Sequence, residues 1–162
     1  MDTLKQVIDR ALAWLVIVVM ASLVIDVLWQ VFTRFVLGNP SSFAEELARY
    51  LLIWVGLLGA SYAAGKRMHL ALDLLPMKLE GRRKRYLEIF IEGCTLVFAF
   101  FVLVVGGVRL VWVTLFLGQT SAALQIPLGY VYLALPLSGL LIMFYAVYAM
   151  GEQIRALRGA PP

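Results

Sequence analysis

The chain has 162 residues, of which 62% are hydrophobic and only 15% charged, and its formal net charge is +4 at pH 7. Soluble domains are nearer half apolar and a quarter charged, so this composition excludes an ordinary water-soluble protein and indicates a membrane protein. Seven basic residues lie between Lys66 and Arg85 and are flanked by apolar segments, which is a membrane-topology pattern rather than a nucleic-acid-binding one. A single cysteine, Cys94, and a single histidine, His69, exclude an intrachain disulfide and a Cys- or His-built metal site.

The first apolar stretch imitates a secretory signal peptide, because Lys5 and Arg10 precede it. It continues to Leu37, however, which is too long for the apolar part of a signal, and no convincing cleavage site follows. We therefore expect this stretch to be retained as the first membrane span.

Four stretches are long and apolar enough to cross a bilayer, which takes ~20 residues of helix. None of them alternates apolar and polar residues as a barrel strand does, so the predicted fold is all-α. The chain is interpreted as one membrane domain, residues 1–162, with helices at about 11–37, 43–65, 87–117 and 128–150 and a basic connection at 66–86.

Proline and serine residues predict where these helices begin, end or bend. Pro40 separates the first helix from the second, and Ser42 is expected to cap the second helix in a capping box with Glu45. Pro136 is expected to kink the fourth helix.

The distribution of lysine and arginine predicts the orientation in the membrane. Eleven of the 14 basic residues lie at the two ends of the chain or in the 66–86 connection, and the other three lie within or at the ends of spans. The positive-inside rule therefore predicts that both termini and the 66–86 connection are cytoplasmic. The two short loops, 38–42 and 118–127, would then face outward.

The first span carries a polar stripe at helical spacing, formed by Asp26, Gln30 and Arg34. An ionisable group near mid-membrane costs several kcal/mol unless it is paired or hydrated, so Asp26 is a candidate ion or proton site. The alternative is an internal ion pair with Arg49 or Arg109, and we favour that structural interpretation.

Two carboxylates begin the second helix, where they favour the positive end of the helix dipole. Glu45 is four residues before Arg49, which predicts a local ion pair. Glu46 points elsewhere and is freer to meet another helix or subunit. We hypothesise that Glu46, Arg49 and Arg34 fix the outer half of the protein by ion pairing within the subunit or between subunits.

The second helix is rich in small residues, which let membrane helices approach closely. This pattern predicts helix packing within the bundle or against a larger partner. The residues expected to pack are Gly56, Gly59, Ala60, Ser61 and Ala64.

The basic connection is expected to set topology and to contact anionic lipid headgroups. The residues assigned to this role are Lys66, Arg67, Arg82, Arg83, Lys84 and Arg85. Close by, Asp73 could orient the imidazole of His69, although interfacial anchoring explains that pair better. The sequence contains no nucleotide-binding, nucleophile or zinc motif, so we predict that the chain is not an enzyme.

The order and spacing of several motifs resemble one transporter family. The first span and its exit contain Asp26-Val27-Leu28-Trp29-Gln30-Val31-Phe32-Thr33-Arg34-Phe35. The second helix and its end contain Glu45-Glu46-Leu47-Ala48-Arg49, Trp54, Gly59-Ala60, Lys66-Arg67, His69 and Asp73. Together with the length and the four spans, this pattern resembles the small membrane subunit, the DctQ-like component, of tripartite ATP-independent periplasmic (TRAP) transporters.

The resemblance implies a small scaffold subunit in a bacterial inner membrane, bound to a large multi-spanning permease subunit. That large subunit would hold the substrate and sodium sites, so no cofactor is expected in this chain. A periplasmic binding protein would deliver an organic acid, and a sodium gradient would drive its import. Docking of that protein is expected on the outward loops, at Asn39, Ser41, Ser42, Gln119, Thr120 and Ser121.

Two other functions are compatible with the residues. The chain could be a self-contained homodimeric carrier or proton exchanger in which Asp26 or Glu92 titrates. A small membrane enzyme is the weakest alternative, because His69 and Asp73 are its only candidate site.

Overall fold

The computed structural model describes residues 2–39, 41–66 and 82–158, and these residues form helices joined by turns and two loops. Four helical segments are long and apolar enough to span a membrane, which confirms the predicted fold class. The first two are α1 (Asp2–Phe35) and α2 (Ser42–Gly65). The third consists of α3 (Arg82–Phe98), the π-helical segment η2 (Ala99–Gly106) and α4 (Gly107–Phe116). The fourth consists of α5 (Leu128–Tyr132) and α6 (Ala134–Arg158).

Several helices extend beyond the ranges expected from apolarity. α1 begins at Asp2 rather than near residue 11, and α6 continues to Arg158 rather than ending near residue 150. These extensions are rich in Lys, Gln, Glu and Arg, which are good helix formers but do not register as membrane-spanning sequence. Apolarity therefore identified the spans but not the full length of the helices.

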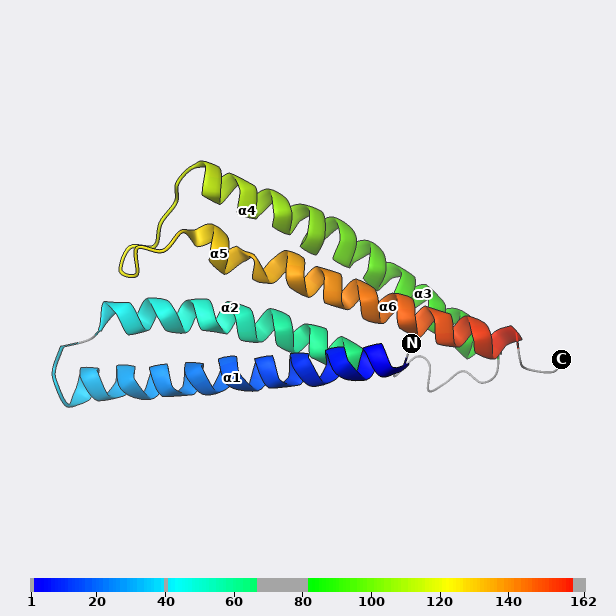
Figure 1. Cartoon of the computed structure of the whole chain (residues 1–162), viewed down its shortest axis with the longest axis horizontal. Helices are drawn as coiled ribbons and strands as arrows, with labels where there is room; N and C mark the ends of the chain where they lie inside the picture. The colour runs from blue at the N-terminus through cyan, green and yellow to red at the C-terminus, as the bar shows by residue number, and fades with distance from the viewer. Residues whose placement is uncertain (1, 40, 67–81, 159–162) are drawn as a thin grey trace.

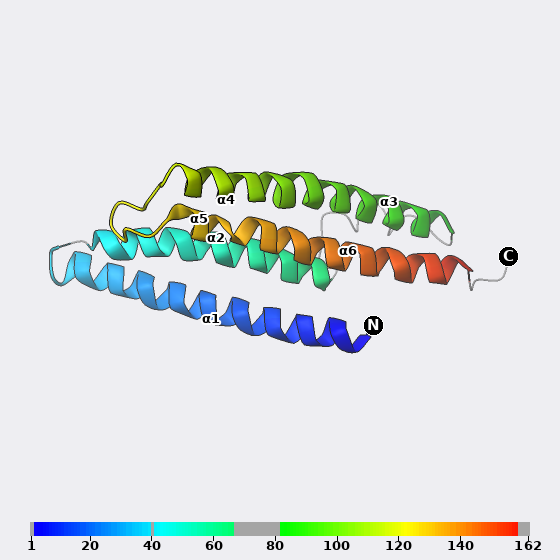
Figure 2. The same cartoon turned by 45° about the horizontal axis from the view of Figure 1, so that its top comes forward.

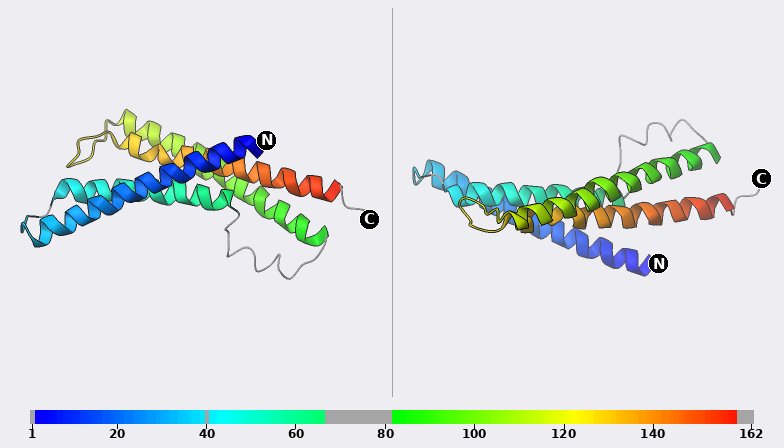
Figure 3. Two further views of the ribbon diagram at one scale, coloured as in Figure 1. Left: turned by 60° about the horizontal axis from the view of Figure 1, so that its bottom comes forward. Right: turned by 90° about the horizontal axis from the view of Figure 1, so that it is seen from above.

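The four helical segments lie side by side in one layer (Figures 1 and 2). Their spatial order is α1, α2, the fourth segment and then the third, so α1 and the third segment form the two edges. In the most apolar 18-residue stretch of the fourth segment, 33% of the residues are buried. The same share is 11% in each of the other three segments, so the fourth segment is the most enclosed. In Figure 3, α1 is inclined across α2, so that its N-terminal part approaches α6.

The two described loops lie at one end of the layer, and the start of α1 and the end of α6 lie at the other (Figure 1). We call these the loop end and the terminus end. Gly38 and Gly118, with φ of 63° and 60°, follow the C-termini of α1 and α4 and adopt the left-handed conformation that commonly ends a helix. The cap of α2 is Ser41 rather than the expected Ser42, because its side chain accepts a hydrogen bond from the amide of Ala44 at 3.4 Å.

Pro136 interrupts the fourth span as expected, although the result is a break rather than a bend. α5 ends at Tyr132, Leu133 adopts a turn, and α6 begins at Ala134. Proline has no amide hydrogen to continue the helical ladder, so the carbonyl one turn earlier loses its partner. The π-helical segment η2 in the neighbouring span has no comparable signal in the sequence.

Glycines allow the third and fourth segments to approach closely. A Cβ on Gly139 of α6 would lie 2.8 Å from Leu103 Cβ of η2. A Cβ on Gly107 of α4 would lie 2.9 Å from Leu135 Cβ of α6. Glycines at helix interfaces let the two backbones approach closely, which is a usual feature of helix association in lipid.

The small residues expected to pack on α2 divide into two groups. Ser61 is fully buried and its hydroxyl donates to the Leu57 carbonyl at 3.0 Å and to the Ser138 carbonyl of α6 at 3.2 Å. Ala64 is half-buried. Gly56 and Gly59 have no atom within 4 Å of the position that a Cβ would occupy, and Ala60 is exposed, so these three do not pack tightly against the described part of the chain.

A compact apolar cluster joins three helices towards the terminus end. Leu12 of α1, Leu58 of α2 and Tyr145 of α6 are each at most 4% exposed and form its centre. Gly65 lies directly against the Tyr145 ring, since a Cβ there would come within 2.7 Å of it. This cluster fixes α1 and α2 against α6.

Candidate functional site

The principal polar site lies at the loop end, where one carboxylate of α2 binds the loop between α4 and α5. The Glu46 carboxylate accepts hydrogen bonds from the amides of Ala122 at 3.1 Å, Ala123 at 2.7 Å and Leu124 at 3.0 Å. The Tyr50 hydroxyl, one turn further along α2, donates to the same carboxylate at 2.8 Å. We call this set of contacts the Glu46 clamp.

The conformation of the loop explains why three consecutive amides converge on one carboxylate. The buried Ser121 hydroxyl accepts from the Leu124 amide at 3.2 Å, and the Ser121 amide donates to the Ile126 carbonyl at 2.9 Å. Gln125 adopts a left-handed φ of 55°, and its side chain donates to the Ala122 carbonyl at 2.9 Å. Successive amides in such a turn form a concave anion-binding nest, and Glu46 supplies the anion.

The clamp joins segments that are far apart in the sequence. The clamp connects α2 to the loop between α4 and α5. It lies at the loop end, where the two edges of the layer, α1 and the third helical segment, are furthest apart (Figure 1). Hydrogen bonds to an ionised carboxylate are among the stronger ones in proteins. The clamp therefore holds the two halves of the layer together at the loop end.

Glu45 and Arg49 form the expected pair one turn apart on α2. Arg49 Nη2 lies 3.5 Å from Glu45 Oε1, but both side chains are about two-thirds exposed. Exposed pairs of this kind contribute little to stability. Within the described residues, Glu46 therefore binds backbone amides rather than a basic side chain, and Arg49 pairs with Glu45. Ion pairing of Glu46, Arg49 or Arg34 with another subunit stays a prediction.

A polar cavity of about 280 Å³ lies beside this pair, between the end of α1 and the start of α2. Gln30, Arg34, Ser41 and Glu45 contribute its polar lining. Arg34 makes no ion pair within the described residues. Gln30 and Arg34 of the polar stripe therefore line a cavity, whereas Asp26 is not among its lining residues.

Asp26 is buried one turn deeper on α1, with only 8% of its surface exposed. Its Oδ2 atom and the Nε2 atom of Gln30 are both buried, and neither has a hydrogen-bond partner among the described residues. Asp26 therefore forms the expected internal pair with neither Arg49 nor Arg109. Arg49 pairs with Glu45 near the loop end instead. The burial of Oδ2 also argues against a direct ion pair with another subunit.

We expect Asp26→Leu to raise the melting temperature of the purified protein by a few degrees. An unpartnered buried polar group costs roughly 1–3 kcal/mol, and a leucine of similar size removes that cost. Differential scanning fluorimetry in detergent measures the shift, with Asp26→Asn as a control that should stay near the wild type. A lower melting temperature for Asp26→Leu would show that the carboxyl group has a stabilising partner.

A second polar cluster, at the terminus end, joins α1, α2 and α6. The Tyr145 hydroxyl donates to Asp9 Oδ1 at 2.6 Å, and Lys66 Nζ lies 3.8 Å from Asp9 Oδ2. Lys66 also lies 5.6 Å from the centre of the Tyr62 ring. Lys66, which was expected to contact lipid, therefore has partners within the chain.

We expect Tyr145→Phe to destabilise the protein by about 1.5 kcal/mol, because it removes a hydrogen bond to a carboxylate without changing the ring that packs on Gly65. Thermal unfolding in detergent measures this effect. Tyr130→Phe is the matched control, because Tyr130 is 60% exposed and should tolerate the change. Equal melting temperatures for the two variants would contradict a stabilising role for the Tyr145–Asp9 bond.

The two loops that carry the predicted docking residues lie at the loop end (Figure 1). Asn39, Ser42, Gln119 and Thr120 are exposed there. Ser121 is only 2% exposed and serves the Glu46 clamp, and the Ser41 side chain caps α2. Of the six residues of the docking prediction, Asn39, Ser42, Gln119 and Thr120 are therefore the exposed ones, and the prediction itself stays a prediction.

The basic connection is described only in part. Arg83 and Lys84 are exposed at the start of α3, as expected for headgroup contacts, and Arg85 is half-buried. Arg67, His69 and Asp73 lie outside the described residues, as does the side chain of Arg82. Within the described ranges, no group of three or more His, Cys, Asp or Glu side chains could hold a metal ion.

Sequence reasoning missed the residues that complete both polar clusters. Asp9 and Tyr145 were not considered, because the sequence gives no sign that α1 and α6 meet at the terminus end. The backbone amides of residues 122–124 have no side-chain signature at all. Gly65, directly before Lys66, was the one sequence feature that could have indicated a large side chain, such as Tyr145, packed at the end of α2.

Comparison with known proteins identifies the family. The family model for the DctQ component of tripartite ATP-independent periplasmic transporters matches residues 23–156. The "Sialic acid TRAP transporter small permease protein SiaQ" of Vibrio cholerae is 29% identical over 103 residues, which are 64% of this chain and 60% of that protein. The "Putative TRAP transporter small permease protein" of Haemophilus influenzae is 28% identical over 144 residues, 88% of this chain and 86% of that protein.

A third relative is much longer. The "Isethionate TRAP transporter permease protein DctMQ" of Oleidesulfovibrio alaskensis is 32% identical over 111 residues, which are 68% of this chain but 17% of that protein. The match thus spans less than two thirds of both the Vibrio and the Oleidesulfovibrio relatives. A family match over most of the chain and four membrane-spanning helices lead to one conclusion. The chain belongs to the DctQ component family of TRAP transporters, and it is a multi-pass inner-membrane subunit of a transporter rather than an enzyme.

Proposed function

We propose that this chain is the stationary small subunit of a TRAP transporter and supports a large permease subunit during import of an organic acid. The observation that carries the proposal is the single layer of helices, in which the Glu46 clamp and the Tyr145–Asp9 bond attach the helices to one another. A layer of this kind presents broad apolar faces, and large exposed hydrophobic side chains occur along all four spans. Apolar faces of this extent suit a wall packed against a second membrane protein.

The longer relative supports a large membrane partner. In DctMQ the segment similar to this chain is a minor part of a longer permease protein. A covalent fusion keeps two parts together permanently, which is consistent with stable association between separate chains in this protein.

We extend the proposal to the substrate and the energy source. The names of two relatives specify sialic acid and isethionate, which are both organic anions, one a carboxylate and the other a sulfonate. The substrate is accordingly an organic acid that a periplasmic binding protein delivers. A sodium gradient drives its import. The sodium site is expected in the large subunit.

The charge distribution supports an orientation with the terminus end in the cytoplasm. The loop end then faces the periplasm and presents Asn39, Ser42, Gln119 and Thr120 to the binding protein. The Glu46 clamp would keep this docking surface in a fixed shape.

A self-contained homodimeric carrier, in which Asp26 or Glu92 titrates, is the alternative. The relatives do not favour it, because their names describe small permease proteins of TRAP transporters or a longer permease protein.

The test is affinity purification of the tagged chain from its native membrane in mild detergent, followed by mass spectrometry and reconstitution. We expect a large multi-spanning protein at equal stoichiometry, and sodium-dependent uptake of an organic acid only when that protein and the binding protein are both present. Uptake by the small chain alone would overturn the proposal, as would purification of the chain without a large membrane partner.

A further inference from the structure

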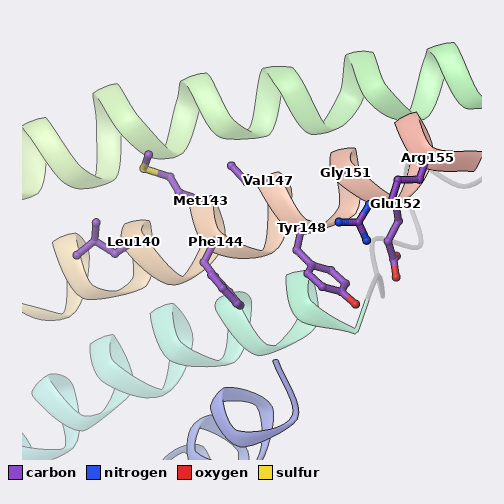
Figure 4. Close-up of a pocket in the computed structure, with 8 residues that line it drawn as sticks. All are labelled: Leu140, Met143, Phe144, Val147, Tyr148, Gly151, Glu152 and Arg155. Carbon is purple, nitrogen blue, oxygen red and sulfur yellow. The ribbon is translucent and has the colours of Figure 1, made fainter. Parts of the chain in front are cut away.

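A groove on α6 near the terminus end is not used by either polar cluster. It has a volume of about 510 Å³ and is lined by α6 side chains from Leu140 to Arg155. In Figure 4 the groove follows α6, with the third helical segment along one side and α2 and α1 along the other. Gly151 lowers its floor, because no atom lies within 4 Å of the position of a Cβ there.

The polarity of the groove changes along its length. Its inner part is apolar, formed by Leu140, Met143, Phe144 and Val147. The opposite charges of Glu152 and Arg155 lie side by side at its terminus end (Figure 4). A change from apolar side chains to a carboxylate beside a guanidinium matches the change from acyl chain to headgroup in a zwitterionic phospholipid.

A further cation stands at the same end of the groove. Lys5 of α1 places its Nζ 4.9 Å from the centre of the Tyr148 ring, which is also part of the groove lining. Two helices thus provide a guanidinium and an ammonium group at the terminus end of the groove. This arrangement favours a headgroup that carries a phosphate together with an amine.

The length of the groove agrees with one leaflet of a bilayer. Leu140 to Arg155 are sixteen residues of α6 and rise roughly 22 Å, which is similar to half of the ~30 Å hydrocarbon core plus a headgroup layer.

We infer that this groove binds one phosphatidylethanolamine molecule, with an acyl chain along Leu140 to Val147. The phosphate lies by Arg155 and Lys5, and the ammonium group lies by Glu152. This inference concerns the chain itself and does not depend on the substrate or partner proposed above.

The test uses the full chain, purified from nanodiscs made of equal amounts of phosphatidylethanolamine and phosphatidylglycerol, washed in detergent and measured by native mass spectrometry. Two variants probe the two ends: Gly151→Leu fills the floor of the groove, and Arg155→Gln removes the phosphate contact. Gly93→Leu is the matched control. It lies on α3 in an apolar groove of about 530 Å³ with no charged lining residue, and it also has no atom within 4 Å of its Cβ position.

We expect the wild type and Gly93→Leu to retain one phosphatidylethanolamine, and Gly151→Leu and Arg155→Gln to retain roughly tenfold less. Melting temperatures near that of the wild type would show that both variants are folded. Equal retention by all four proteins would mean that the lipid is only annular and would overturn the inference. Retention of phosphatidylglycerol in preference to phosphatidylethanolamine would overturn the assignment of the ammonium group to Glu152.

Discussion

Replacing Gly139 with alanine should destabilise the protein by roughly 1–3 kcal/mol, which is the usual cost of overpacking a close contact. The new Cβ would lie 2.8 Å from Leu103 Cβ and 3.2 Å from the backbone nitrogen of Val104. Neither atom is the end of a flexible side chain, so α6 must move away from η2. Thermal unfolding in detergent should show a melting temperature lower by on the order of 5 °C.

The control for this experiment is Gly93→Ala, since Gly93 is also inside a helix but has open space at its Cβ position. Alanine is favoured over glycine in a helix interior by about 1 kcal/mol, and both variants receive this gain. The difference in melting temperature between the two variants therefore reports the cost of the close contact at Gly139 alone. Equal shifts in the two variants would show that α6 and η2 do not meet as closely as described.

Replacing Glu46 with glutamine should release the loop between α4 and α5. The amide NH₂ of glutamine is a donor, and in place of Oε2 it would face the donating amides of Ala123 and Leu124. We expect a melting temperature lower by on the order of 5 °C. Hydrogen exchange at residues 122–124 should become at least roughly tenfold faster, because these amides lose their acceptor.

Glu45→Gln separates this effect from a general loss of charge at the start of α2. Glu45 has the same chemistry, but its side chain is 70% exposed and its one ion-pair partner is the exposed Arg49. Its removal should change neither the melting temperature nor the exchange of the loop by a measurable amount. If the two variants behaved alike, the Glu46 clamp would have no special role.

The helices were predictable because they depend on local information. Long apolar runs define membrane spans, and Pro136 marks an interruption that follows from the missing amide hydrogen. The ends of α1 and α6 were less predictable, since their polar residues continue a helix without continuing the apolar pattern. The π-helical segment was not predictable, because Ala99–Gly106 has no residue that distinguishes it from ordinary helix.

The candidate site was predictable only where both partners lie on one helix. The spacing of Glu45 and Arg49 was sufficient to predict their ion pair. Glu46 was identified as a residue free to meet another segment, but its partners are backbone amides of residues 122–124, which carry no sequence signal. Likewise the Asp9–Tyr145 bond depends on how α1 crosses towards α6, a tertiary property that local spacing does not contain.

The one-layer arrangement also determines how stability is distributed. In a layered order α1, α2, α6, α3, each helix touches mainly its immediate neighbours, so there is no central core shared by all four. As in repeat proteins, the total stability then approximates a sum of nearest-neighbour interfaces. Substitutions at different interfaces, such as Tyr145→Phe and Gly139→Ala, should have nearly additive effects when they share no contact. An edge helix such as α1 can also detach while the remaining interfaces persist, so unfolding should begin at an edge and proceed inward.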